Sequence, residues 1–165
     1  MEDDAIYVAD VGQNQIWSCA YHVVKNGRFL TSGGMGTMGY SIPAAMGAKY
    51  ALKDKQVIAV CGDGSFQMSM MELATMRQHG IHSKIIVLKN HYLGMVRQYQ
   101  HYTYKDNYSV VDLSGCPDLE HIAKAYDMPF YRLTDMEQME QMLDEFLGNE
   151  SACMMEVSID PMDLV

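Results

Sequence analysis

Two unbroken apolar runs in the middle of the chain predict neighbouring strands of a parallel sheet. The runs are Val57–Val60 and Ile85–Leu88. Continuously apolar strands are typical of parallel sheets that helices cover on both faces. The segment between the runs places four apolar residues on one helical face and ends near Gly80: Phe66, Met70, Leu73 and Ala74. The pattern therefore predicts a strand–helix–strand unit.

The same strand and helix patterns extend to both ends of the chain. Short apolar runs predict strands at Ala5–Ala9, Phe130–Leu133 and Ala152–Ile159. Apolar spacing predicts a helix with Trp17, Ala20, Tyr21 and Val24 on one face, closed by Gly27. We therefore expect one domain over residues 1–165, a three-layer α/β/α fold with a mostly parallel sheet.

Capping residues and proline predict where the other helices begin. Ser41 and Pro43 open one helix, and Pro117 and Asp118 open another. A Thr134–Glu137 capping box opens the last helix, which Gly148 stops. The polar, tyrosine-rich stretch His101–Asp112 predicts an exposed, mobile loop.

Composition excludes several classes of partner. The net charge is −9 with no basic cluster, which argues against nucleic acid and anionic membranes. No apolar run reaches the roughly 18–20 residues that span a membrane. Met-Glu-Asp-Asp at the start lacks the positive segment of a signal peptide. The four cysteines are scattered and lack metal-ligand spacing, so we expect reduced thiols and a cytoplasmic protein: Cys19, Cys61, Cys116 and Cys153.

Polar residues follow both central strands and predict a metal–phosphate site. Asp63 and Asn90 lie just past the strand ends, where parallel sheets bind ligands. Gly62 and Gly64 allow close backbone approach, and Ser65 begins a helix whose free N–H groups suit phosphate. A carboxylate and an amide oxygen beside a phosphate form a hard, oxygen-rich site for Mg²⁺. An acidic protein needs such a cation to hold a diphosphate.

The surrounding residues resemble a known family. The string G-D-G-S-F-Q-M, followed by K-I-I-V-L-K-N-H-Y-L-G-M-V-R-Q, resembles thiamine-diphosphate enzymes, and acetolactate synthase large subunits in particular. The resemblance implies the diphosphate-type thiamine-diphosphate-binding fold. It also implies Mg²⁺ ligands at Asp63, Asn90 and the backbone of Tyr92. Lys89 stands where the family usually has the first Asn of an Asn–Asn pair.

Three further strings extend the resemblance. G-G-M-G-T-M-G-Y resembles the aminopyrimidine loop, which implies that the Gly36 carbonyl and Met38 contact the cofactor. V-G-Q-N-Q-I-W implies a diphosphate contact for Gln13, although Asn14 replaces the usual His. L-G-M-V-R-Q-Y implies a substrate channel at Met95, Val96 and Tyr99, with Tyr99 replacing a Trp that helps select the acceptor. The implied cofactor-binding set is Gln13, Gly36, Met38, Gly62, Asp63, Gly64, Ser65, Asn90, Tyr92, Leu93, Gly94 and Met95.

The resemblance covers nearly all of this chain but only the last part of a whole synthase. No segment here resembles the family's pyrimidine-binding domain, which carries the glutamate that activates the cofactor, so we expect no catalytic residue in this chain. The central domain is also absent, so FAD would belong only to a full-length or partner context. We expect a pyrimidine-binding domain or chain as partner, a homo- or hetero-oligomer, and a small 2-oxo acid as substrate.

These features favour the thiamine-diphosphate and Mg²⁺ binding domain of an acetolactate-synthase-like transferase. Such an enzyme decarboxylates pyruvate and joins the two-carbon unit to a second 2-oxo acid, in branched-chain amino acid biosynthesis. Two alternatives remain: a subunit of another thiamine-diphosphate decarboxylase or carboligase, and a non-catalytic cofactor-binding module. A nucleotide-binding domain is disfavoured, because G-D-G-S is neither a P-loop nor G-x-G-x-x-G.

Overall fold

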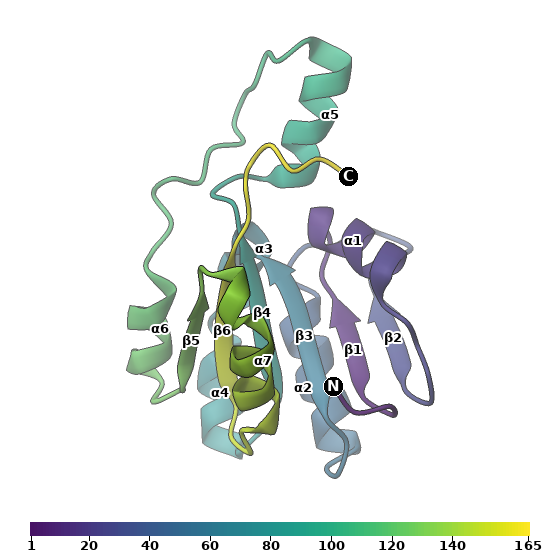
Figure 1. The fold of residues 1–165 in the computed structure, drawn as a ribbon, viewed down its shortest axis with the longest axis vertical. Coiled ribbons are helices and arrows are strands. Elements are labelled where there is room, and N and C mark those ends of the chain that lie inside the picture. Colours follow the sequence, from purple (N-terminus) through teal and green to yellow (C-terminus); the bar gives the residue numbers. More distant parts are fainter.

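A six-stranded, all-parallel sheet forms the centre of the molecule (Figure 1). The computed structural model describes residues 1–165. The strand order is β2-β1-β3-β4-β6-β5. The strands are β1 (Ile6–Ala9), β2 (Arg28–Thr31), β3 (Val57–Gly62), β4 (Lys84–Lys89), β5 (Phe130–Leu133) and β6 (Cys153–Ser158).

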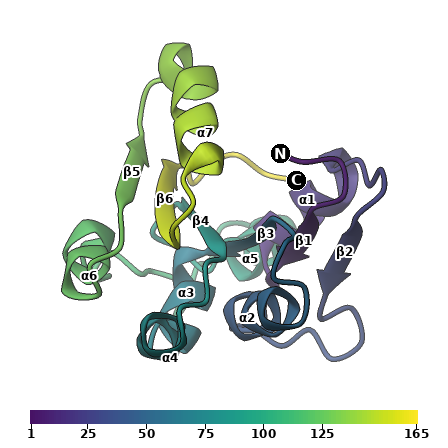
Figure 2. The ribbon, with the colours of Figure 1, turned by 90° about the horizontal axis from the view of Figure 1, so that it is seen from below.

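Helices cover both faces of this sheet, which confirms the three-layer α/β/α prediction (Figure 2). One face carries α1 (Gln13–Tyr21) and α7 (Met139–Gly148). The other carries α2 (Ser41–Ala51), α3 (Asp63–Ser69), α4 (Glu72–His79) and α6 (Leu119–Ala125). The helix α5 (Gly94–Tyr104) stands beyond the carboxyl end of the sheet, and a 3₁₀ turn, η1 (Met136–Gln138), precedes α7. No helix is both long and apolar enough to cross a membrane.

The main hydrophobic core lies between the sheet and the α2/α4 layer. Alternate residues of each strand point into it, as Val57, Ala59 and Cys61 do from β3. Phe66 and Leu73 enter it from the helices, and both are fully buried. Because the central strands are covered on both faces, β3 and β4 carry continuous apolar runs, residues 57–61 and 85–88, rather than alternating ones.

The chain reverses its winding direction between β1 and β3. From β1 the chain moves outward to the edge strand β2, whereas from β3 it moves the other way to β4. Ligands bind beyond the carboxyl ends of strands at such a switch point. The turns that follow β1 and β3 therefore meet where a site is expected.

The first helix differs from its prediction. It ends at Tyr21, and Tyr21 and Val24 are 79% and 48% exposed. Its buried residues are polar: Gln13, Asn14 and Ser18. Gly27 does not close the helix; a Cβ there would lie 1.9 Å from the Ala5 carbonyl oxygen, so the glycine permits close chain packing instead.

Three other boundaries also differ. The helix after Asp63 is broken at Met70–Met71 into α3 and α4, and Ala74 is exposed, although Gly80 ends α4 in the left-handed conformation as predicted. The helix α5 runs to Tyr104, into the stretch predicted as a loop. Asp135 rather than Thr134 caps the turn before α7, and its carboxylate accepts from the Glu137 N–H at 2.9 Å.

Candidate functional site

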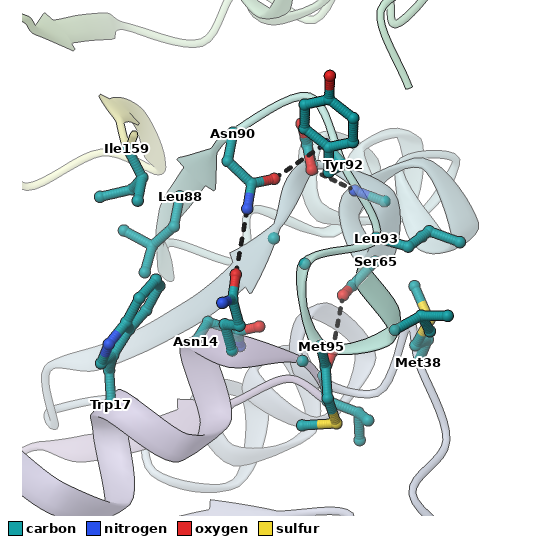
Figure 3. A pocket seen from close by; sticks show the side chains of 18 of the residues that line it. Asn14, Trp17, Met38, Ser65, Leu88, Asn90, Tyr92, Leu93, Met95 and Ile159 are labelled. Atoms are coloured by element: carbon teal, nitrogen blue, oxygen red, sulfur yellow. Dashed lines mark hydrogen bonds between the residues drawn. The ribbon is translucent and has the colours of Figure 1, made fainter. Parts of the chain in front are cut away.

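A cavity of about 260 Å³ opens at the carboxyl end of the sheet, at the switch point. Four chain segments and one tail residue line it (Figure 3). They are the segment after β1 (Val11, Gly12, Gln13, Asn14 and Trp17), the glycine-rich loop (Gly36 and Met38), the turn after β3 (Gly62, Asp63, Gly64 and Ser65), the segment from β4 into α5 (Leu88, Asn90, Tyr92, Leu93, Gly94, Met95 and Val96), and Ile159. Every implied cofactor-binding residue thus lies at this one cavity.

Asp63 brings a buried carboxylate to the cavity without a cation beside it. Asp63 is only 2% exposed, and its carboxylate forms no salt bridge. One oxygen accepts from the Gly64 N–H at 2.9 Å and the other from the His91 N–H at 2.8 Å. Burial raises the pKa of Asp63, and these two hydrogen bonds offset only part of that effect. A bound cation would stabilise the ionised form.

Asn90 and Tyr92 complete an oxygen-rich corner with Asp63. The Asn90 Oδ1 accepts from the Tyr92 N–H at 2.9 Å (Figure 3). Consecutive N–H groups, those of His91 and Tyr92, therefore hold the Asp63 and Asn90 oxygens, which keeps the two side chains close together. His91 adopts a left-handed φ of 60°, a strained conformation that makes this tight turn. The Tyr92 carbonyl oxygen accepts no hydrogen bond from the protein.

The start of α5 offers unpaired donors to an anion. The N–H groups of Gly94, Met95 and Val96 have no acceptor within the protein. Such groups, together with the positive end of the helix dipole, suit a phosphate. Gly94 is required here by close packing, because a Cβ would lie 2.0 Å from the Gln13 Oε1 and 2.8 Å from the Asn90 Nδ2.

Gln13 and Asn14 lie at the cavity, but other protein groups hold their amide donors. The Gln13 Nε2 donates to the Gln98 Oε1 at 2.9 Å and to the Asp163 carbonyl at 3.2 Å. Its Oε1 accepts from the Asn90 Nδ2 at 3.2 Å. The Asn14 Nδ2 donates to the carbonyls of Asp10 and Val60, at 2.8 and 3.2 Å. Asn14 thus ties α1 to the ends of β1 and β3, and its side chain has no donor left for a phosphate.

The apolar side of the cavity is formed by the side chains of Met38 and Leu93, which lie close to the backbone of Gly64. A Cβ at Gly64 would meet the Leu93 Cδ2 at 2.8 Å and the Met38 Cε at 3.4 Å. Ser65, the next residue, is buried, and its hydroxyl donates to the Val11 carbonyl at 3.2 Å. Gly36 has a φ of 64° and no neighbour within 4 Å of its Cβ position, so its backbone is free to approach a ligand.

The structure separates Tyr99 from the other implied channel residues. Met95 and Val96 line the cavity, whereas Tyr99 lies outside the lining and is 59% exposed on α5. The lining also includes residues that the implied binding set omits: Val11, Gly12, Asn14, Trp17, Leu88, Val96 and Ile159. Four of them, Val11, Gly12, Asn14 and Trp17, belong to the V-G-Q-N-Q-I-W string and could have been predicted from it. No local pattern predicted Ile159, because it reaches the cavity only through the fold.

These features define the class of protein. It is an α/β domain in which a carboxylate, an amide oxygen and a helix N-terminus line one cavity at the switch point of a parallel sheet. Comparison with known families makes the class specific. Residues 10–157 match the family model described as "Thiamine pyrophosphate enzyme, C-terminal TPP binding domain". The chain belongs to this family.

Several curated relatives carry the name acetolactate synthase. The chain is 42% identical to the acetolactate synthase of Arthrospira platensis over 94% of its own length. It is 38% identical, over 98% of its length, to the acetolactate synthase isozyme 2 large subunit of Escherichia coli (strain K12). It is 47% identical, over 80% of its length, to the acetolactate synthase large subunit of Lactococcus lactis subsp. lactis (strain IL1403). The match spans only 27%, 30% and 23% of these relatives, respectively.

Proposed function

We propose that this chain is the thiamine-diphosphate and Mg²⁺ binding domain of an acetolactate-synthase-like enzyme. The enzyme would decarboxylate pyruvate and join the two-carbon unit to a second 2-oxo acid. The observation that carries the proposal is the buried, cation-free carboxylate of Asp63, which lies beside Asn90 at the start of α5. The family match and the names of the relatives support the choice of cofactor and reaction.

Each part of the cavity has a role in this proposal. Asp63, Asn90 and the free Tyr92 carbonyl hold Mg²⁺, and the first N–H groups of α5 hold the diphosphate. Gly36 and Met38 contact the ring system, while Met95 and Val96, which line the cavity, border the path of the substrate. Thiamine diphosphate, when bound, supplies the nucleophilic carbon and accepts the electrons released with CO₂. The protein supplies position and charge.

The rest of the active centre would come from other parts of the enzyme. Because the match spans less than a third of the relatives, we propose that a pyrimidine-binding domain supplies the other wall of the cavity. FAD, where the enzyme uses it, would lie in a central domain and not against this chain. The working form would be a homo- or hetero-oligomer. The four cysteines are all free, which suits a reducing cytoplasmic compartment.

Calorimetry tests the binding proposal directly. Thiamine diphosphate is titrated into the chain with and without Mg²⁺, and binding should require the metal. Asp63→Ala and Asn90→Ala should each weaken Mg²⁺-dependent binding by about tenfold or more, since each removes a ligand or charge. Asp118→Ala is a matched control, because Asp118 caps α6 away from the cavity. Metal-independent binding, or equal losses in all three variants, would contradict the proposal.

One observation favours a second candidate, another thiamine-diphosphate carboligase or decarboxylase. Tyr99 replaces the Trp that the resemblance associates with acceptor choice, and it lies outside the cavity on an exposed helix face. A reconstituted enzyme should therefore be assayed with pyruvate and with other 2-oxo acids, as donor and as acceptor. A preference for a donor other than pyruvate would favour this second candidate.

A further inference from the structure

The carboxylate of Asp10 is a second buried acidic group near the cavity, and the proposed chemistry gives it no role. Asp10 follows β1 directly and is 0% exposed. No lysine, arginine or histidine forms an ion pair with it. A buried carboxylate without a cation is costly unless hydrogen bonds satisfy it. Its partners therefore indicate what it does.

Three backbone N–H groups converge on this carboxylate, one from the next residue and two from a segment about thirty residues further along the chain. Its Oδ1 accepts from the Val11 N–H at 2.8 Å and the Gly39 N–H at 2.9 Å, and its Oδ2 accepts from the Ser41 N–H at 2.7 Å. Gly39 ends the glycine-rich loop and Ser41 begins α2. The helix has no side-chain cap of its own. Asp10 therefore caps α2 from the neighbouring strand and fastens the end of the loop to β1.

The two halves of the glycine-rich loop are constrained very differently. A Cβ at Gly34 or Gly36 would meet nothing within 4 Å, and Met35 is 90% exposed. Gly39, in contrast, has a φ of 83°, and a Cβ there would lie 3.1 Å from the Met68 Cβ. The loop is thus open at its beginning and held at its end, between Asp10 on one side and Met68 on the other.

Met38 lies immediately before this fixed point. It lines the cavity beside Gly64 and Leu93. Its backbone position follows from the Gly39 hydrogen bond, because a single peptide unit separates the two residues. A loop with four glycines in seven residues has many other conformations, so the anchor decides where Met38 lies.

We propose that Asp10 is a positioning residue for the cofactor: it places Met38 against the ring system by fixing the Gly39–Ser41 backbone. This role rests on the proposed function, because it assumes that the cavity binds thiamine diphosphate. It concerns only the half of the site that meets the rings. The diphosphate half, made by Asp63, Asn90 and the start of α5, is built on β3 and β4 and does not depend on the loop.

The test separates the two halves of the site. The affinity of the chain is measured by calorimetry for Mg²⁺–thiamine diphosphate and for Mg²⁺–pyrophosphate, which lacks the rings. Asp10→Asn should lower affinity for the first ligand about tenfold and leave the second unchanged. Asp118→Asn, the same change at a helix cap remote from the cavity, should alter neither. Equal losses for both ligands, or no loss for either, would overturn the positioning role.

A double-mutant cycle and a measurement without ligand keep the proposal testable even if Asp10→Asn folds poorly. If Asp10 acts through Met38, Asp10→Asn should cost little thiamine-diphosphate affinity in a Met38→Ala background. Additive losses would overturn the positioning role.

Hydrogen exchange without ligand tests the anchor itself. The Gly39 and Ser41 amides should resist exchange in the wild type and exchange faster in Asp10→Asn. Unprotected wild-type amides would overturn the anchor. If the wild type binds neither ligand while its amides are protected, the proposed function fails and the anchor stands as a purely structural feature.

Discussion

At the scale of single residues, Gly94 sets how closely α5 approaches the metal corner. A Cβ there would lie 2.0 Å from the Gln13 Oε1 and 2.8 Å from the Asn90 Nδ2, so Gly94→Ala must displace one or both amides. We expect an overpacking cost of about 1–3 kcal/mol in unfolding free energy. Mg²⁺-dependent binding of thiamine diphosphate should weaken as well. Gly34→Ala is the matched control, since a Cβ there meets nothing within 4 Å.

Urea unfolding and calorimetry of both variants measure these effects. A Gly94→Ala variant with the stability and affinity of Gly34→Ala would show that the close approach at α5 is unimportant.

His22 gives the stability of the chain a dependence on pH. Its ring stacks on Tyr7 with centroids 4.2 Å apart, and burial lowers the pKa of His22 below its ordinary 6.5. The folded state therefore favours the neutral ring. The contribution of the neutral His22 ring to the free energy of unfolding is fully present above the ordinary pKa of histidine. It is lost as pH falls through the lower pKa of the folded state. His22→Phe should remove this part of the acid sensitivity.

The measurement is the free energy of unfolding in urea, followed from neutral pH downward. His79→Phe serves as the control, because His79 is exposed at the end of α4. Identical pH profiles for the wild type and His22→Phe would contradict the prediction.

At the scale of elements, α5 and the C-terminal segment are held together by Arg97. Its Nη1 donates to the Pro161 carbonyl at 2.7 Å, and its guanidinium lies over the rings of Tyr92 and Tyr108 at 5.0 and 4.6 Å. Arg97→Leu removes these contacts, so the amides of Met162 and Asp163 should exchange faster with solvent. Gln13 would also lose its Asp163 acceptor.

Hydrogen exchange at residues 159–165 measures this effect. Arg77→Leu is the control, because Arg77 is an exposed residue of α4. Unchanged exchange at Met162 in Arg97→Leu would show that the segment is held by other contacts.

The elements also show what local sequence can predict. Continuously apolar runs identified β3 and β4, because burial on both faces imposes that pattern. The first helix was predicted too long, because Tyr21 and Val24 are apolar yet exposed. The residues buried instead are polar, and two of them, Gln13 and Asn14, line the cavity. The apolar spacing did not predict the break at Met70–Met71 or the end of α5 at Tyr104, because propensity and spacing are only weak guides to where a helix ends.

The site divides in the same way. The positions of Asp63 and Asn90 follow from sequence, since each ends a strand of one strand–helix–strand unit. Gln13 donates to Gln98 and to Asp163, which are distant in sequence, so these contacts could not be predicted from local sequence. The role of Asp10 was hidden for the same reason: the groups that it holds lie about thirty residues further along the chain.

At the scale of the whole molecule, the cavity lies beside a helix, α5, that exposes large side chains. The helix α5 extends beyond the sheet (Figure 1). Four of its large side chains are exposed: Val96, Tyr99, Tyr102 and Tyr104. Large exposed apolar patches are typical of interaction sites, which is what the proposed partner domain requires. The match to only part of each relative agrees with this.

Under the proposed function, turnover should depend on the portions of the relatives that the match does not span. The purified 165-residue chain, supplied with Mg²⁺, thiamine diphosphate and pyruvate, should form no acetolactate, because the proposal assigns the group that activates the cofactor ring to a pyrimidine-binding domain. Adding the pyrimidine-binding and central portions of a relative's large subunit should restore turnover. Asp63→Ala in that assembly should abolish it, whereas Asp118→Ala should not. Acetolactate formation by the chain alone would refute the dependence, and an assembly that binds the cofactor but turns over no 2-oxo acid would identify the chain as a non-catalytic binding module.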